Sequence, residues 1–269
     1  MCKFKLFNII SITIIILNSS NGKPLHSISN NSNDGEEVCI ENPRFGHTVT
    51  ILYKDEIFTG VVHNAYNVLT VGHPFVDVNI TELQVRIGST YAHKGGQLIS
   101  VKEIALHPKY YEDEFTFDLA FLRLSDKMDL IKYPVRNIIY YNQDITEPKV
   151  GESVFTTGWG QSHINGILKT ANISIIDNKF CHKAYKYNGN TICAGYEPNK
   201  CATQVDSIGG PLVCELNSYI YLCGIKVHAK HSNKKKVFPG VYAKVNHPEI
   251  LEWLRKGGLL DVEENYKYV

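Results

Sequence analysis

The chain has 269 residues, of which 43% are hydrophobic and 11% aromatic, so it can bury the core of one large domain or two small ones and is not intrinsically disordered. Its 28 Lys and Arg residues balance 27 Asp and Glu residues, which leaves a formal charge of +1. A nearly neutral chain has no global attraction to nucleic acid or to a membrane, and we expect neither as a partner.

The N-terminus has the pattern of a secretory signal peptide. Lys3 and Lys5 precede an apolar run over residues 6–17, and small polar residues follow up to Gly22. A membrane anchor would need roughly 20 apolar residues, which this run lacks. We therefore predict a signal peptide over residues 1–22 and a secreted, extracellular protein.

The segment after the signal peptide, residues 23–38, is polar and rich in Asn and Ser, which predicts a flexible leader. Beyond it, short β-like runs alternate with turn residues, and no long helical period separates them. Many short strands of this kind predict antiparallel barrels or a sandwich. The runs are "HTVTILY", "NVLTVG", "LQVRIG", "DLAFLRL", "SVFTTGWG", "ISII", "GPLVC", "YIYLCGIKV" and "GVYAKV".

A helix is predicted near the C-terminus, over residues 247–256. Asn246 can cap it, Glu249 follows three residues later, and two glycines come after it. The helix has an apolar face made of Ile250, Leu251, Trp253 and Leu254. The remaining residues, 258–269, are predicted to be a frayed tail.

Loss of the signal peptide removes Cys2 and leaves six cysteines in the secreted chain. An even number favours disulfides, although six cysteines allow 15 connectivities. No pair has the close spacing of a zinc site, so we expect no metal and no cofactor. Glycosylation sequons occur at Asn30, Asn79 and Asn172.

Three segments taken together indicate a family. They are "VLTVGHPF" with His73, "DLAFLRL" with Asp118 and "VDSIGGPLVC" with Ser207, and "TGWG", "NTICAGY" and "FPGVYAKV" stand around them in the right order. Over nearly all of the mature chain the sequence resembles the trypsin/chymotrypsin-like serine peptidases. The phrases "KVGESVFTTGWG" and "LISVKEIALHPKY" are most similar to the digestive peptidases of mites and other arthropods.

The resemblance implies an all-β fold of two six-stranded antiparallel barrels with the active site in the cleft between them. The peptidase domain would span residues 39–257. Its first barrel would cover about 39–138 and its second about 147–245, as the position of the matched motifs indicates.

The resemblance also implies a catalytic triad, in which His73 is the base, Asp118 orients it and Ser207 is the nucleophile. The family motif G-D-S-G-G-P places the nucleophile directly before the first glycine, Gly209. Counted back from the glycines, Ile208 holds that position and Ser207 replaces the family's Asp. Counted forward from "DS", Ser207 is in place and Ile208 is an insertion.

The nucleophile loop is altered under either count. A slip of one residue moves the backbone by about 3.3 Å, whereas proton transfer needs heavy atoms about 2.6 to 3.2 Å apart. The glycine that donates to the oxyanion becomes Val205 or Asp206. Loss of one such donor lowers the rate on the order of 10² to 10³. We therefore expect the three triad positions not to function as a set.

The activation terminus and the substrate groove differ from the family as well. Asn33 and Ser32 stand where cleavage after a basic residue would free an Ile terminus. The groove edge matches Val227, His228 and Ala229 in place of Ser-Trp-Gly. The remaining groove positions are Gly240 and the pocket floor, where Asn199 or Lys200 replaces the acid that selects Arg and Lys.

The disulfides follow partly from the resemblance. Cys181 with Cys193 matches a family bridge. Since "CELNSYIYLC" resembles a hairpin, Cys214 is expected to pair with Cys223, and this leaves Cys39 with Cys201.

The functional prediction is a secreted, monomeric serine protease homologue that has lost catalysis and binds an extracellular protein. Inactive paralogues of mite digestive peptidases are associated with inhibition of host defence proteins such as complement, and the resemblance implies that class of partner. The alternative is an active secreted endopeptidase that uses a displaced Ser207 with His73 and Asp118.

Overall fold

The computed structural model describes residues 46–111, 115–133, 147–160, 166–185, 191–195, 207–216, 219–228 and 239–256. These residues belong to one compact unit of the chain, residues 36–269. The predicted signal peptide, leader and tail lie outside the described residues, as do Asn30, Cys39 and Cys201.

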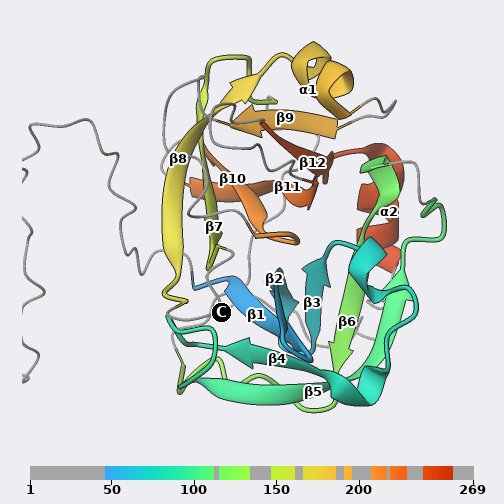
Figure 1. The fold of residues 1–269 in the computed structure, drawn as a ribbon, viewed down its shortest axis with the longest axis vertical. Coiled ribbons are helices and arrows are strands. Elements are labelled where there is room, and N and C mark those ends of the chain that lie inside the picture. The colour runs from blue at the N-terminus through green and yellow to red at the C-terminus, as the bar shows by residue number, and fades with distance from the viewer. Residues whose placement is uncertain are drawn as a thin grey trace, which may run out of the picture. The chain divides into compact units, whose positions relative to one another are not determined.

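Twelve strands among the described residues form two closed antiparallel barrels, as predicted (Figure 1). The first barrel has the strand order β1-β2-β3-β6-β5-β4. It consists of β1 (Thr48–Tyr53), β2 (Glu56–Asn64), β3 (Asn67–Thr70), β4 (Leu83–Ile87), β5 (Gln97–Leu106) and β6 (Ala120–Leu124). The 3-10 helices η2 (His73–Phe75), η3 (Ile80–Glu82) and η4 (Phe115–Phe117) lie in its connections.

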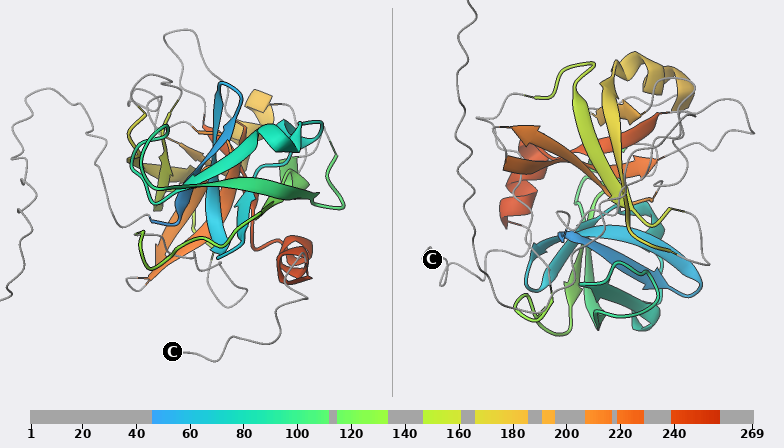
Figure 2. Two further views of the ribbon diagram at one scale, coloured as in Figure 1. Left: turned by 90° about the horizontal axis from the view of Figure 1, so that it is seen from below. Right: turned by 90° about the vertical axis from the view of Figure 1, so that its left-hand side faces the viewer.

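The second barrel has the order β10-β11-β12-β9-β8-β7, and Figure 2 shows it stacked on the first. It consists of β7 (Ser153–Gly158), β8 (Lys169–Ile176), β9 (Thr191–Gly195), β10 (Pro211–Leu216), β11 (Tyr219–His228) and β12 (Gly240–Lys244). The last strand of the first barrel ends at Leu124 and the first strand of the second begins at Ser153.

Alternating apolar side chains fill the interior of the barrels. In β4, Leu83, Val85 and Ile87 are fully buried while the two residues between them are only partly buried. This is the two-residue period of a strand with one face on a core. A direct side-chain contact joins the barrels, because the hydroxyls of Thr48 and Thr157 lie 2.7 Å apart.

The C-terminal helix α2 (Pro248–Lys256) is present, but the predicted cap is wrong. The first helical bond runs from the amide of Leu251 to the carbonyl of His247, which makes His247 the residue before the first turn. Asn246 does not cap. Its amide donates to Glu147 at 3.2 Å, and its Oδ1 is buried without a partner.

Helix α2 follows the second barrel in sequence but packs on the first. The Trp253 ring lies 4.7 Å from the Phe121 ring and 4.8 Å from the His107 ring, centroid to centroid. The helix therefore ties the two barrels together. A second helix, α1 (Asn178–Tyr185), was not predicted from the sequence.

Two of the three expected disulfides lie in the described residues, and both are formed. Cys181 is bonded to Cys193 and links α1 to β9. Cys214 is bonded to Cys223 and crosses the β10–β11 hairpin. The pairing of Cys39 with Cys201 lies outside the described residues.

Candidate active site

His73 and Asp118 come together although 45 residues separate them. Strand β3 pairs with β6 so that Thr70 lies opposite Ala120, which places the end of one strand beside the start of the other. His73 begins η2 just after β3, and Asp118 immediately precedes Leu119 and β6. Strand pairing, rather than closeness in sequence, therefore builds this half of the site.

The two side chains form a short, oriented pair. His73 Nδ1 lies 2.6 Å from Asp118 Oδ2, and because a carboxylate only accepts, Nδ1 carries the proton. Asp118 Oδ1 accepts from the backbone amides of His73 at 2.7 Å and Gly72 at 3.0 Å. The Asp118 side chain is 4% exposed and that of His73 is 41% exposed. Nε2 is thus the ring nitrogen available to act as a base.

Ser207 and Ile208 lie in a tight turn at the start of β10. The amide of Gly210 donates to the carbonyl of Ser207 at 3.1 Å, and Gly209 has a φ of +80°. A positive φ at the third residue of a four-residue turn is the signature of a type II turn, which favours glycine there. The turn contacts the first barrel as well, since the amide of Thr59 donates to the carbonyl of Ile208 at 2.9 Å.

The Ser207 hydroxyl is engaged by backbone groups of the second barrel. Its Oγ accepts from the amides of Trp159 at 3.1 Å and Gly160 at 3.0 Å, and Ser207 is 7% exposed. Strand β10 pairs with β7, which ends just before Trp159, and this pairing sets the contact. Among the hydrogen bonds of the described residues, none joins Ser207 to His73.

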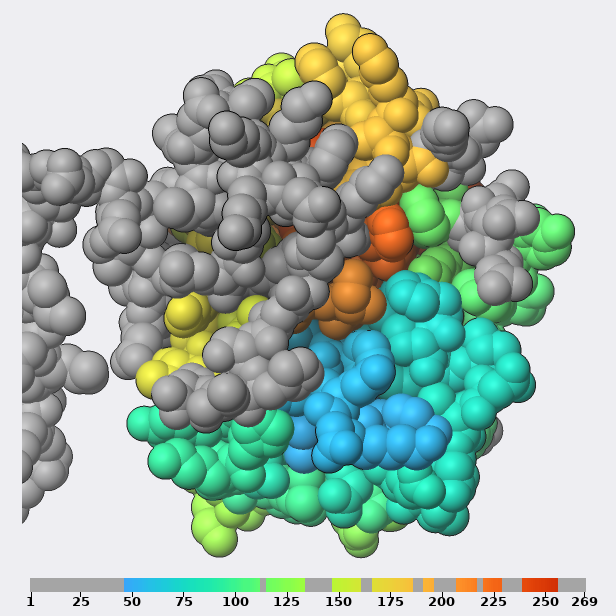
Figure 3. Space-filling view, viewed as in Figure 1, coloured from blue at the N-terminus to red at the C-terminus, as the bar shows by residue number. Residues whose placement is uncertain are grey.

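Gly209 has no room for a side chain. A Cβ at this position would lie 2.1 Å from the carbonyl oxygen of Thr59 and 2.3 Å from the hydroxyl of Thr70. In Figure 3 the orange surface that contains this turn borders the blue surface of the first barrel at the centre of the face. The glycine therefore allows the two barrels to approach at the site.

The predicted groove residues are described only in part. Asn199, Lys200, Val205, Asp206 and Ala229 lie outside the described residues.

The described groove residues are Val227, His228 and Gly240. Val227 is fully buried and does not present its side chain to a ligand. His228 stacks on Phe115, with ring centroids 5.3 Å apart, and meets the Tyr185 ring edge-on at 5.1 Å. Sequence reasoning missed both aromatic neighbours, because they come from η4 and α1.

Lys226 is a further residue that sequence reasoning missed. It lies on β11 and is 6% exposed, which is unusual for a lysine. Burial lowers the pKa of its amine to about 7. No sequence pattern predicts that a single lysine within a strand is buried.

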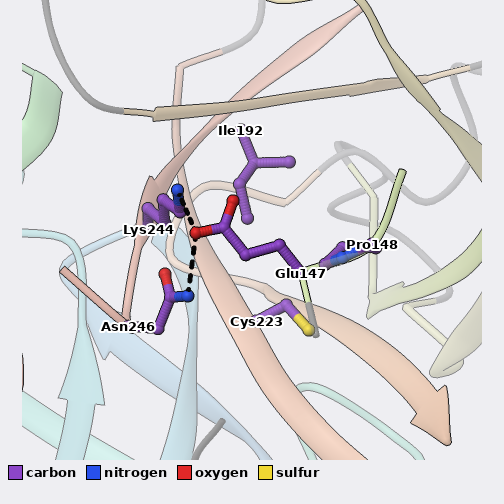
Figure 4. A pocket seen from close by; sticks show the side chains of 6 residues that line it. All are labelled: Glu147, Pro148, Ile192, Cys223, Lys244 and Asn246. Carbon is purple, nitrogen blue, oxygen red and sulfur yellow. Dashed lines mark hydrogen bonds and ion pairs between the residues drawn. The ribbon is translucent and has the colours of Figure 1, made fainter. Parts of the chain in front are cut away.

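The pocket in Figure 4 lies in the second barrel and is lined by Glu147, Pro148, Ile192, Cys223, Lys244 and Asn246. Its charged groups bind one another, because Lys244 Nζ lies 2.6 Å from Glu147 Oε1. We therefore interpret this pocket as part of a structural contact between the residues that precede β7 and the end of β12. Within the described residues, no group of three His, Cys, Asp or Glu side chains is arranged to hold a metal ion.

Both described sequons are exposed. Asn79 precedes η3 and accepts from the amide of Thr81 at 3.2 Å, and Asn172 lies on β8. Neither side chain is buried, so glycosylation at both sites stays a prediction that burial does not contradict.

The two barrels, with a paired histidine and aspartate at their junction, define a serine peptidase fold of the chymotrypsin type. A family model described as Trypsin matches residues 36–254. The chain belongs to the trypsin family.

Individual relatives agree with this assignment. Trypsin 5G1 of Aedes aegypti is 32% identical over 237 residues, which cover 82% of this chain and 83% of that protein. Trypsin theta of Drosophila melanogaster is 29% identical, over 72% of this chain and 74% of its own. The structure of neuropsin, a serine protease expressed in the limbic system of mouse brain, is 26% identical with a TM-score of 0.65. The match covers 81% of this chain and 96% of the neuropsin chain.

No helix among the described residues is long and apolar enough to cross a bilayer.

Proposed function

We propose that this trypsin family member is secreted, does not hydrolyse peptides by the serine mechanism, and acts by binding another extracellular protein. One observation carries the loss of catalysis: the Ser207 hydroxyl accepts two backbone hydrogen bonds from Trp159 and Gly160 and none of its bonds reaches His73. A serine nucleophile must also donate its proton to the base, and among the described residues Ser207 has no hydrogen bond to His73.

The contacts of the turn favour the count in which Ile208 holds the nucleophile position. An inserted residue would bulge away from the barrels, but Ile208 is half-buried, packs against the core and offers its carbonyl to Thr59. Ser207 is the residue that faces inward. An isoleucine at that position supplies no group that can attack a carbonyl.

Rotation of Ser207 toward His73 would break both amide contacts. Each buried amide left without a partner costs about 1 to 3 kcal/mol. The rotation therefore costs roughly 2 to 6 kcal/mol, and each 1.4 kcal/mol corresponds to about a factor of ten in rate. This penalty supports loss of activity even if a substrate binds.

The rival function, an active endopeptidase, has one observation in its favour, which is the intact His73–Asp118 pair. That pair also satisfies two backbone amides, at Gly72 and His73, so its presence has a structural reason. A structural reason for retaining the pair removes the need to invoke catalysis.

A labelling experiment tests the proposal. The purified mature chain is treated with a fluorophosphonate, which modifies activated serines, and offered a broad set of fluorogenic peptides. We expect no more labelling and turnover than with Ser207→Ala, while an active arthropod trypsin serves as the positive control. Stoichiometric labelling of Ser207 would overturn the proposal.

The binding role is supported by the altered groove and by the resemblance to inactive mite paralogues, which points to host defence proteins such as complement. We expect the purified chain to lower complement-mediated haemolysis in serum in a dose-dependent manner. An unchanged haemolysis at all concentrations would exclude that partner class and leave the catalytic proposal standing.

A further inference from the structure

Lys226 is held directly against the turn that carries Ile208. Its amide donates to the carbonyl of Gly210 at 2.8 Å, and its carbonyl accepts from the amide of Gly209 at 2.8 Å. These two bonds place Lys226 beside the turn at which a ligand of the candidate site would lie. The surroundings of Lys226 therefore decide what such a ligand can insert.

The Lys226 side chain shares one face of the β11–β12 pair with Tyr242 and Gly240. Lys226 lies opposite Tyr242 in the strand register, and Gly240 comes two residues earlier on β12. Residues directly opposite each other, or two apart on one strand, project from the same face. The adjacent Ile225 is fully buried on the other face, in the core of the barrel.

The lysine fills the space beside Gly240. A Cβ built on Gly240 would lie 3.0 Å from Lys226 Cε, and Lys226 Nζ lies 5.6 Å from the centroid of the Tyr242 ring. Tyr242 is equally close, because its Cε2 would lie 3.0 Å and its hydroxyl 3.3 Å from that Cβ, so Lys226 and Tyr242 together fill the space beside Gly240. With Lys226 only 6% exposed, that volume is already occupied.

The same lysine makes the site unfavourable for a second cation. Burial lowers the pKa of its amine to about 7, so near neutral pH it is partly charged and poorly solvated. A ligand guanidinium or ammonium would meet a like charge at short range, where the interior screens charges weakly.

We infer that Lys226 determines what this groove can bind: its side chain occupies, from within the chain, the space beside Gly240 and excludes any ligand that inserts a cationic or aromatic side chain there. This inference goes beyond the proposed function and does not depend on whether Ser207 reacts. A chain with peptidase activity would still obey it.

The test compares small probes that need no catalysis. Phenol represents an aromatic side chain and benzamidine a cationic one, and binding is followed by NMR shift titration. Wild type should bind neither measurably. Lys226→Ala should bind phenol at least about tenfold more tightly, as an opened apolar space does, with shifts at Gly240 and Tyr242.

Two further variants separate space from charge. Lys226→Met keeps the space filled without a charge and should bind phenol as weakly as wild type. Lys244→Ala, the matched control on β12, removes a lysine that binds Glu147 and should change nothing. Lys226→Val, a milder truncation, takes the place of Lys226→Ala if the latter fails to fold.

Three results would overturn the inference. The first is wild type binding either probe with shifts at Tyr242. The second is a folded Lys226→Ala or Lys226→Val with no gain in phenol binding. The third is a gain in Lys226→Met equal to that in Lys226→Ala, because charge rather than occupied space would then be the barrier.

Discussion

His73 and Asp118, on the first barrel, lie 2.6 Å apart in the arrangement that an acid–base pair needs, whereas Ser207, on the second, accepts hydrogen bonds from Trp159 and Gly160 instead. The His73–Asp118 pair also has a structural role, because Asp118 accepts hydrogen bonds from two backbone amides. On the second barrel, the turn has the two glycines of the family motif, and in the proposed function its reacting position is Ile208. Under that proposal, the comparison teaches that groups needed for the fold persist when groups needed only for chemistry change.

The largest expected effect is at Gly209. In Gly209→Ala the new Cβ would lie 2.1 Å from the Thr59 carbonyl oxygen at a φ of +80°, so we expect a loss of at least about 5 kcal/mol of stability or no soluble protein. Gly151→Ala is the matched control, because Gly151 has a φ of +88° and nothing within 4 Å. It should cost only about 1 to 2 kcal/mol. Equal losses of stability, measured by chemical denaturation, would show that Gly209 is required because of backbone strain alone and not because of the contact between the barrels.

Lys226, on the second barrel, should make the stability of the folded chain depend on pH. Its amine has a pKa of about 7 in the folded chain against 10.5 for the unperturbed group. Between these values the unfolded chain binds more protons, so stability rises with pH from 7 to 10.5 and is flat outside that window as far as this group is concerned. The full rise is at most about 5 kcal/mol.

The measurement is the free energy of unfolding of wild type minus that of Lys226→Met across this range. The difference isolates the lysine from other titrating groups. We expect Lys226→Met to be the more stable chain near pH 7 and the gap to close toward pH 10.5. A constant difference would mean that Lys226 is charged and well partnered in the folded chain.

The stability of the first barrel should depend on Asp118 more than on His73. Asp118→Ala leaves the amides of Gly72 and His73 without an acceptor, and we expect a cost of about 2 to 4 kcal/mol. His73→Ala removes a side chain that is 41% exposed and should cost less than about 1 kcal/mol. Asp118→Asn, which keeps an acceptor oxygen, should recover most of the loss. If His73→Ala proves as damaging as Asp118→Ala, the structural account of this pair is wrong.

The smallest expected change in activity is at Ser207, where we expect none. Ser207→Ala removes the acceptor for two backbone amides and should lower stability by about 2 to 6 kcal/mol without changing turnover of any peptide. Thermal unfolding and the fluorogenic peptide set measure the two readouts on the same sample. A loss of turnover without a loss of stability would show that Ser207 serves catalysis and not the fold, which contradicts the comparison between the two barrels.

Much of the fold could be predicted from local sequence. Nine of the strands have apolar alternation or β-branched runs bounded by turn residues, and helix α2 has an apolar face. Strands β2, β5 and β9 and helix α1 were not recognised, because polar residues or short length hide their period. The cap of α2 was assigned to Asn246, yet Pro248 starts the helix one residue later than that assignment requires.

The sequence by itself determined the family, the two barrels, the candidate site residues and the pairings of Cys181 with Cys193 and Cys214 with Cys223. It left open which residue stands in the nucleophile position, since both counts through "DSIGG" fit the motif. Only the tertiary structure decided where the Ser207 hydroxyl points and that Lys226 fills the space beside Gly240. Those outcomes depend on contacts between strands far apart in sequence, such as β7 with β10 and β11 with β12, which no local pattern encodes.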